Sequence, residues 1–238
     1  MPVSAALALA AHLNACRHSP LSPEVAARAV VGDHAAHHVV DSDGLLGLDS
    51  MTASELDRAI TAALLLVDSD WAVALPRPGR LAPLAGPPTL TTGALDAGAV
   101  VLPVAGGPAW IPRAVGPAIQ WQILHSAPPR LTTTAAEADR QLREVVVHVG
   151  RRLADLPLGT SEEVDTPPPT LPACYGSRSQ QLLARAWRLS RAAETALADD
   201  GDTLHVHAIG ARRHALGELR DAAETALAAA VTWTGASA

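Results

Sequence analysis

The stretch from Asp33 to Gly44 concentrates side chains that could bind a metal. It reads Asp-His-Ala-Ala-His-His-Val-Val-Asp-Ser-Asp-Gly. If the preceding helix continues through it, His34 and His38 share one helix face, four residues apart, in a geometry that binds zinc or another divalent metal. Asp41 or Asp43 would then supply an oxygen ligand.

Neither of the stronger metal motifs accompanies this stretch. The sequence contains no HExxH, and the residues after Gly44 lack the remaining ligands of a calcium loop. The pattern therefore predicts a divalent metal site on His34, His38 and Asp41, and a solvated loop with chance histidines is the alternative. No other cofactor is predicted.

A second candidate is a row of arginines on one face of a predicted helix, formed by Arg185, Arg188 and Arg191. Guanidinium groups bind phosphate and carboxylate through paired hydrogen bonds. The row predicts a site for an acidic ligand or nucleic acid, and a solvated helix face is the alternative. The net charge of −6 argues against a broad nucleic-acid surface.

Two weaker clusters lie in the same half of the chain. His205 and His207 would share a face on a strand but diverge on a helix, and we expect helix or loop there. Cys174 comes just before a predicted helix, where a thiol can have a lowered pKa. The alternative for Cys174 is a half-buried side chain at a domain junction.

The composition excludes several classes of enzyme. All 18 positive charges are arginine, so the chain lacks the lysine of Walker A loops, of pyridoxal-phosphate enzymes and of protein kinases. The sequence contains no GxSxG and no GxGxxG. These absences leave enzymatic function open but favour a non-catalytic protein.

The residues available for a core are unusual in kind. Of 238 residues, 48% are hydrophobic, yet phenylalanine is absent and five tryptophans are the main large anchors. Richness in Ala, Arg, Gly and Pro without lysine is typical of high-GC genomes, such as those of actinobacteria. Only two cysteines and no apolar run near 18 residues indicate a cytoplasmic protein without a membrane span.

The positions of proline and glycine divide the chain into helical ends and a broken centre. Helical periodicity predicts helices at 3–16 and 22–31, from Thr52 onward, from Thr134 to Leu156, and at 177–199 and 211–232. Between Asp70 and Ser126, prolines and glycines permit only short strands at 71–75, 99–104 and 118–124. The predicted class is α+β: N-terminal helices, a small antiparallel sheet in the Pro/Gly-rich centre, and a helical C-terminal portion.

These elements predict a domain at 1–158, a Pro-rich linker at 159–173 and a C-terminal helical hairpin at 174–238, which packs on the first domain or stands apart. The leading functional hypothesis is a non-catalytic binding or scaffolding protein that forms a homo-oligomer through its Ala-rich helices. It expects an exposed apolar patch on the last two helices. The alternatives are a metal-dependent hydrolase at the Asp33–Asp43 cluster and a regulatory module that binds through the arginine row.

Overall fold

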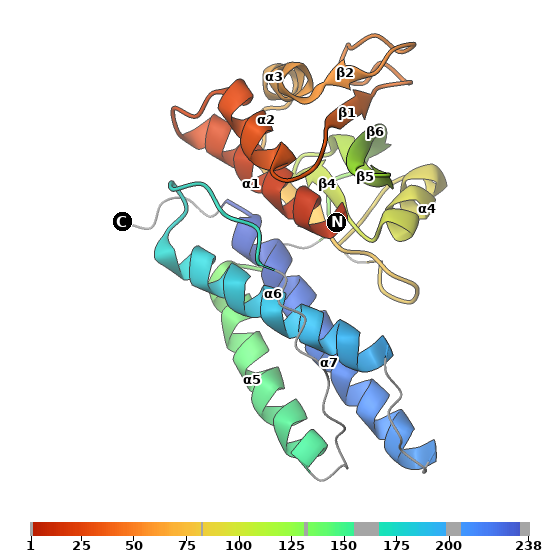
Figure 1. Ribbon diagram of the computed structural model, residues 1–238, viewed down its shortest axis with the longest axis vertical. Helices are drawn as coiled ribbons and strands as arrows, with labels where there is room; N and C mark the ends of the chain where they lie inside the picture. The colour runs from red at the N-terminus through yellow and green to blue at the C-terminus, as the bar shows by residue number, and fades with distance from the viewer. Residues whose placement is uncertain (1, 82, 131–132, 155–166, 199–205, 234–238) are drawn as a thin grey trace. The chain divides into compact units, whose positions relative to one another are not determined.

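The computed structural model describes residues 2–81, 83–130, 133–154, 167–198 and 206–233, with backbone only at 206–208. These residues form seven helices and one six-stranded mixed sheet, which confirms the α+β class (Figure 1). The chain divides into two compact units. Unit 1 comprises Met1–Thr132, Pro169–Gly176 and Val231–Ala238, and unit 2 comprises Thr133–Pro168 and Ser177–Ala230.

The sheet of unit 1 has the strand order β2-β1-β6-β5-β4-β3. Neighbouring strands are antiparallel except β1 and β6, which are parallel. The strands are β1 (His37–Val40), β2 (Ser54–Glu55), β3 (Trp71–Ala74), β4 (Val100–Pro103), β5 (Gly107–Val115) and β6 (Ala118–Ser126). The predicted sheet was therefore too small, because β1 and β2 come from the chain before residue 70.

Helices cover both faces of this sheet (Figure 1). On one side, α1 (Pro2–His18) contacts β3, β4 and β5, while α2 (Pro23–Val31) and α3 (Leu56–Leu66) extend the layer toward β1. On the other side lies α4 (Pro88–Ala97), which contacts β5 and β6. The Pro/Gly-rich centre was expected to exclude helices. Pro88 nevertheless suits the first turn of α4, where its missing N–H costs no hydrogen bond.

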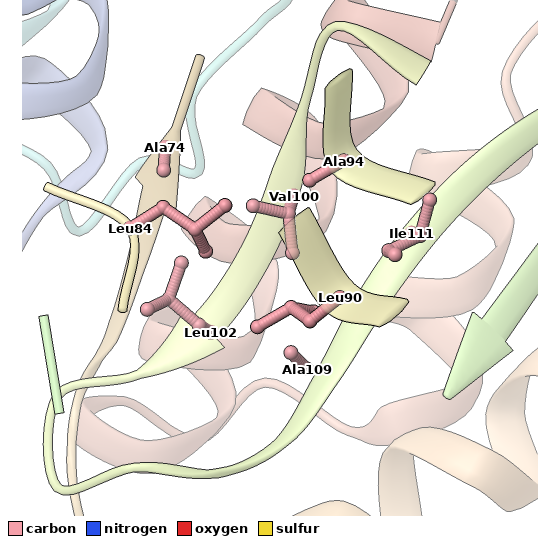
Figure 2. Close-up of a cluster of buried hydrophobic side chains, with 8 residues drawn as sticks. All are labelled: Ala74, Leu84, Leu90, Ala94, Val100, Leu102, Ala109 and Ile111. Atoms are coloured by element: carbon pink, nitrogen blue, oxygen red, sulfur yellow. The ribbon is translucent and has the colours of Figure 1, made fainter. Parts of the chain in front are cut away.

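Figure 2 shows how α4 packs on the sheet. Its Leu90 and Ala94 lie against buried side chains from three strands and a loop, namely Ala74, Leu84, Val100, Leu102, Ala109 and Ile111. A Cβ atom at Gly93 would lie 2.8 Å from Cδ1 of Ile111. Glycine at this position therefore permits the close approach of the helix to β5.

A row of tryptophans occupies the opposite face of the sheet. Trp71, Trp110 and Trp121 are fully buried and meet edge to face, with ring centroids 6.4 and 6.2 Å apart. This geometry aligns the positive edge of one ring with the negative face of the next. The prediction that tryptophans anchor the core is confirmed for these three and for the buried Trp187.

A buried amide ties the central layer of unit 1 together. The Asn14 side chain, on α1, is fully buried; its Nδ2 donates to the Trp71 carbonyl at 2.9 Å and to the Val231 carbonyl at 3.1 Å. Its Oδ1 accepts the Trp71 N–H at 2.8 Å. The Tyr175 hydroxyl donates to the same Val231 carbonyl at 2.8 Å. Four segments far apart in sequence therefore meet at one polar point.

Unit 2 consists of the long helices α5 (Ala135–Ala154), α6 (Ser177–Ala198) and α7, whose range Val206–Val231 ends in unit 1. The predicted capping box at the start of α5 is confirmed, because Thr134 and Glu137 exchange hydrogen bonds through their side chains and backbone amides. Sequence analysis grouped α5 with residues 1–158, whereas it shares a compact unit with α6 and α7. Most of the predicted linker at 159–173 lies outside the described residues. None of the described helices combines the length and apolarity needed to cross a membrane.

Replacement of Asn14 should destabilise the protein strongly. In Asn14→Ala, the buried Trp71 N–H and C=O lose their side-chain partners, which we expect to cost about 3 kcal/mol of unfolding free energy. Tyr175→Phe removes one of the two donors to Val231, so its expected cost is about 1 kcal/mol. Urea denaturation of both variants measures the difference. Equal costs, or a neutral Asn14→Ala, would contradict the role assigned to Asn14.

Candidate functional site

The predicted metal ligands His34 and His38 do not share a helix face. Helix α2 ends at Val31, and the next residue, Gly32, has φ = +49°, a backbone conformation that favours glycine. His34 then lies in a turn, with Nδ1 3.1 Å from the Val31 carbonyl oxygen, and His38 is exposed on strand β1. The helix predicted at 22–31 does end at Val31, so the continuation on which the shared face depended does not occur.

The third predicted ligand, Asp41, organises a loop. Its carboxylate is buried and accepts the backbone N–H groups of Leu45, Leu46 and Leu48 at 2.8, 2.9 and 3.2 Å. Within the described ranges, no three His, Cys, Asp or Glu residues form a group that could hold a metal ion. The metal prediction therefore rests on the sequence alone.

The predicted arginine row is largely engaged within unit 2. Arg185 forms an ion pair with the buried Asp139 of α5, and Arg191 pairs with Glu194. Arg188 is exposed and donates from Nε to the Ala184 carbonyl at 3.3 Å. Anion binding by the three guanidinium groups stays a prediction.

The two weaker candidates, the His205–His207 pair and Cys174, gain no functional support from the structure. His205 and the side chain of His207 fall outside the described residues. Cys174 is half-buried just before α6, as the alternative interpretation expected. The other cysteine, Cys16, is also half-buried, and burial raises the pKa of its thiol to about 11. Cys16 is therefore protonated at neutral pH and unsuited to nucleophilic chemistry.

The functional candidate that emerges is His37, which sequence analysis left out. Alternation along β1 places His37 and Val39 in the interior and His38 outside. The indole Nε1 of Trp121, on β6, donates to Nδ1 of His37 at 3.2 Å. Because an indole N–H can only donate, Nδ1 must be the acceptor, and the proton of the neutral imidazole must be on Nε2.

The surroundings of His37 keep it neutral. Burial, reinforced by the neighbouring His34, lowers the pKa of His37 to about 4. At neutral pH the ring therefore presents Nε2–H as a hydrogen-bond donor. That nitrogen is buried and has no hydrogen-bond partner among the residues described. An unpaired buried donor costs free energy, and Nε2 shares this condition with the indole Nε1 atoms of Trp71 and Trp110 among the described residues.

A cavity of about 510 Å³ adjoins His37. It is lined by α2, by the turn between α2 and β1, and by the first residues of α3; we refer to it as the His37 cavity. Its volume falls in the range of small-molecule sites. Its charged lining residues are Glu24, Arg28, Glu55 and Asp57.

The helices and strands that carry these four charged residues determine where the residues lie. Residues Glu24 and Arg28 are four apart on α2, so they lie on the same side of the helix. Pairing of β1 with β2 sets Glu55 opposite His38, and Glu55 then serves as the N-cap of α3 without a side-chain capping bond. The positive end of the α3 dipole therefore also faces this region.

Stability should fall with acidification in a window set by His37. An unfolded histidine binds a proton near pH 6.5, whereas folded His37 requires a pH of about 4. Between these values the unfolded state binds more protons, so lowering the pH favours unfolding. The buried His12, whose pKa burial also lowers, acts in the same direction.

Urea denaturation of wild type and His37→Gln between pH 7 and pH 4.5 measures the contribution of His37. We expect wild type to lose about 2 kcal/mol more than the variant over this range, less than the full 1.4 kcal/mol per pKa unit because pH 4.5 still lies above the folded pKa of about 4. His38→Gln, which alters the exposed neighbour, should behave like wild type. Parallel curves for wild type and His37→Gln would refute the shifted pKa.

Comparison with known proteins places the chain in a family without adding a function. Residues 6–138 match the description "Rv1486c-like protein, N-terminal domain", and residues 126–228 match "Rv1486c-like protein, C-terminal domain". No curated protein matches the chain, and no solved structure does. The overlap of the two matches contains the division between units at Thr132 and Thr133. The chain therefore belongs to the family of Rv1486c-like proteins.

Proposed function

We propose that unit 1 is a non-catalytic binding module for a small polar molecule, which enters the His37 cavity. The observation that carries this proposal is the buried Nε2–H of His37. His37 lines the cavity and is only 2% exposed, and its Nε2 is buried without an acceptor among the described residues. A ligand oxygen or nitrogen placed there would satisfy the donor.

The tautomer of His37 supports binding over catalysis. A histidine acts as a general base through an unprotonated ring nitrogen near its target. The unprotonated nitrogen of His37 is Nδ1, which already accepts the Trp121 N–H. The low pKa further weakens the ring as a base at neutral pH. What His37 offers to a bound molecule is one fixed hydrogen-bond donor.

The proposal includes a cytoplasmic location, and it keeps self-association as a prediction. The small residues of the last helices, including Ala193, Ala223 and Ala226, are buried within the chain. The large exposed apolar side chains of the described ranges lie on other segments, so the patch expected on the last two helices is absent there. Homo-oligomerisation through the Ala-rich helices stays a prediction. The half-buried Cys16 and Cys174, free in the structure, fit the reducing cytoplasm.

The Trp121 indole provides a direct test of binding. Its N–H is bonded to His37, so a molecule that engages Nε2 should change the indole NMR shift. We expect this resonance, assigned through Trp121→Phe, to move when a set of polar metabolites is titrated into ¹⁵N-labelled protein. The shift should vanish in His37→Leu and persist in His38→Leu.

Backbone spectra of both variants establish that they remain folded. Ligand-induced shifts that survive unchanged in a folded His37→Leu protein would contradict the assignment of the site. If no polar compound moves the Trp121 indole, the proposal of a binding module fails.

A further inference from the structure

One face of the sheet in unit 1 is open over β2, β1, β6 and the end of β5. Helix α4 covers the same face over β4 and β5, where its Leu90 and Ala94 pack (Figure 2). The side chains that alternation along the strands directs to the open face are partly or fully exposed. They are Glu55, His38, Val40, Gln120, Gln122 and Arg113.

Strand register places four polar side chains of this face in one line across the sheet. The pairs are Glu55 with His38, His38 with Gln120, and Gln120 with Arg113. Residues paired in register point to the same face of a sheet. We call this line the polar row. It begins with a carboxylate on β2 and ends with a guanidinium on β5.

The two charges of the polar row lie too far apart to pair within one chain. Three strand spacings of about 4.8 Å separate Arg113 from Glu55, which amounts to about 14 Å. Both side chains are exposed, and neither has an ion-pair partner among the residues that the structure describes. Each charge can therefore pair with a group on another molecule.

A second copy of the same face complements the polar row. A twofold rotation about an axis parallel to the strands, between β1 and β6, reverses the row of the second copy. Glu55 of each chain then faces Arg113 of the other, so two ion pairs form at once. A uniformly acidic or basic protein would instead meet a like charge at one end of the row. Charge complementarity therefore favours a copy of this chain.

Apolar side chains flank the polar row on the same face. Val115, two residues beyond Arg113 on β5, is 54% exposed, and Val40, two residues beyond His38 on β1, is partly exposed. Their burial between two copies would add a hydrophobic contribution. The open face spans about 14 Å in each direction, so it supplies only part of the roughly 800 Å² per chain of a standard interface. The expected dimer is therefore weak.

We propose that the protein forms a weak twofold dimer through the open face of its sheet, with Glu55 of each chain paired to Arg113 of the other. This surface differs from the Ala-rich helices. The proposal goes beyond the binding function and does not depend on it, because His37 is directed to the opposite face of the sheet.

Sedimentation velocity at protein concentrations from about 5 to about 500 µM tests this proposal. We expect wild type to change from monomer to dimer across the range, with a dissociation constant of about 50 µM. Arg113→Glu and Glu55→Arg should each raise this constant at least about tenfold, because each variant places like charges opposite one another twice per dimer. Arg140→Glu, which reverses an exposed charge on α5, should leave it unchanged.

Equimolar mixing of Arg113→Glu with Glu55→Arg identifies the pairing. One chain then carries a negative charge at both ends of the polar row and the other a positive charge at both ends. In a mixed dimer both contacts are attractive, so we expect the mixture to dimerise at least as tightly as wild type. Added salt should weaken this association, because exposed ion pairs are screened.

Three outcomes would overturn the proposal. The first is wild-type protein that stays monomeric at the highest concentration. The second is a dimer that both single variants keep, because such a dimer uses another surface. The third is a mixture of the two variants that stays monomeric. Circular dichroism and tryptophan fluorescence establish that the variants are folded, which we expect because both substituted side chains are exposed.

Discussion

The hydrogen bond from the Trp121 indole to Nδ1 of His37 fixes the chemistry of the candidate site. It joins the parallel pair β1 and β6 through their side chains on the buried face of the sheet. Because the indole can only donate, the bond determines the tautomer of the imidazole. The remaining ring proton is thereby placed on Nε2, in a residue that lines the cavity. Nδ1 of His37 thus makes a core contact, while Nε2 of the same ring is the donor on which the proposed binding function depends.

The position of that ring depends on the rest of unit 1. Trp121 packs against Trp110, and Trp110 packs against Trp71, whose backbone N–H and C=O are both bonded to Asn14. Asn14 in turn holds the Val231 carbonyl, at the end of α7. A sequence of buried contacts within unit 1 therefore runs from Val231 to His37. Its members are large aromatic rings and one fully satisfied amide, which tolerate little displacement in a close-packed interior.

The sequence predicted the elements whose signals are local. The capping box at Thr134, the cap at Ser22 and the alternation around Trp121 depend on neighbouring residues, and each element formed as expected. The strand β1 was missed because its four residues follow a helix and carry two histidines, which a helical period also accommodated. Its conformation comes from pairing with β6, more than 80 residues later. The end of the preceding helix was predicted correctly at residue 31, and Gly32 follows it as the C-cap.

The sequence predicted the candidate site only in part. The histidine cluster was identified, but the residue within it that adjoins the cavity was not, because burial depends on the sheet. Helix α4 was missed for the same kind of reason, since its stability comes from packing on β4 and β5. The ion pair between Arg191 and Glu194 joins neighbours on one helix. The ion pair between Arg185 and Asp139 joins two helices, so no spacing in the sequence reveals it.

The most direct test of this account is the protonation state of His37, measured by long-range ¹H–¹⁵N NMR of imidazole-labelled protein between pH 7 and pH 5. The structure predicts a neutral ring with its proton on Nε2 across this range, since the pKa is lowered to about 4. His38, exposed on the same strand, serves as the internal reference. A proton on Nδ1 at pH 7, or a fully cationic ring by pH 5, would contradict both the hydrogen bond from Trp121 and the donor on which the proposed function depends.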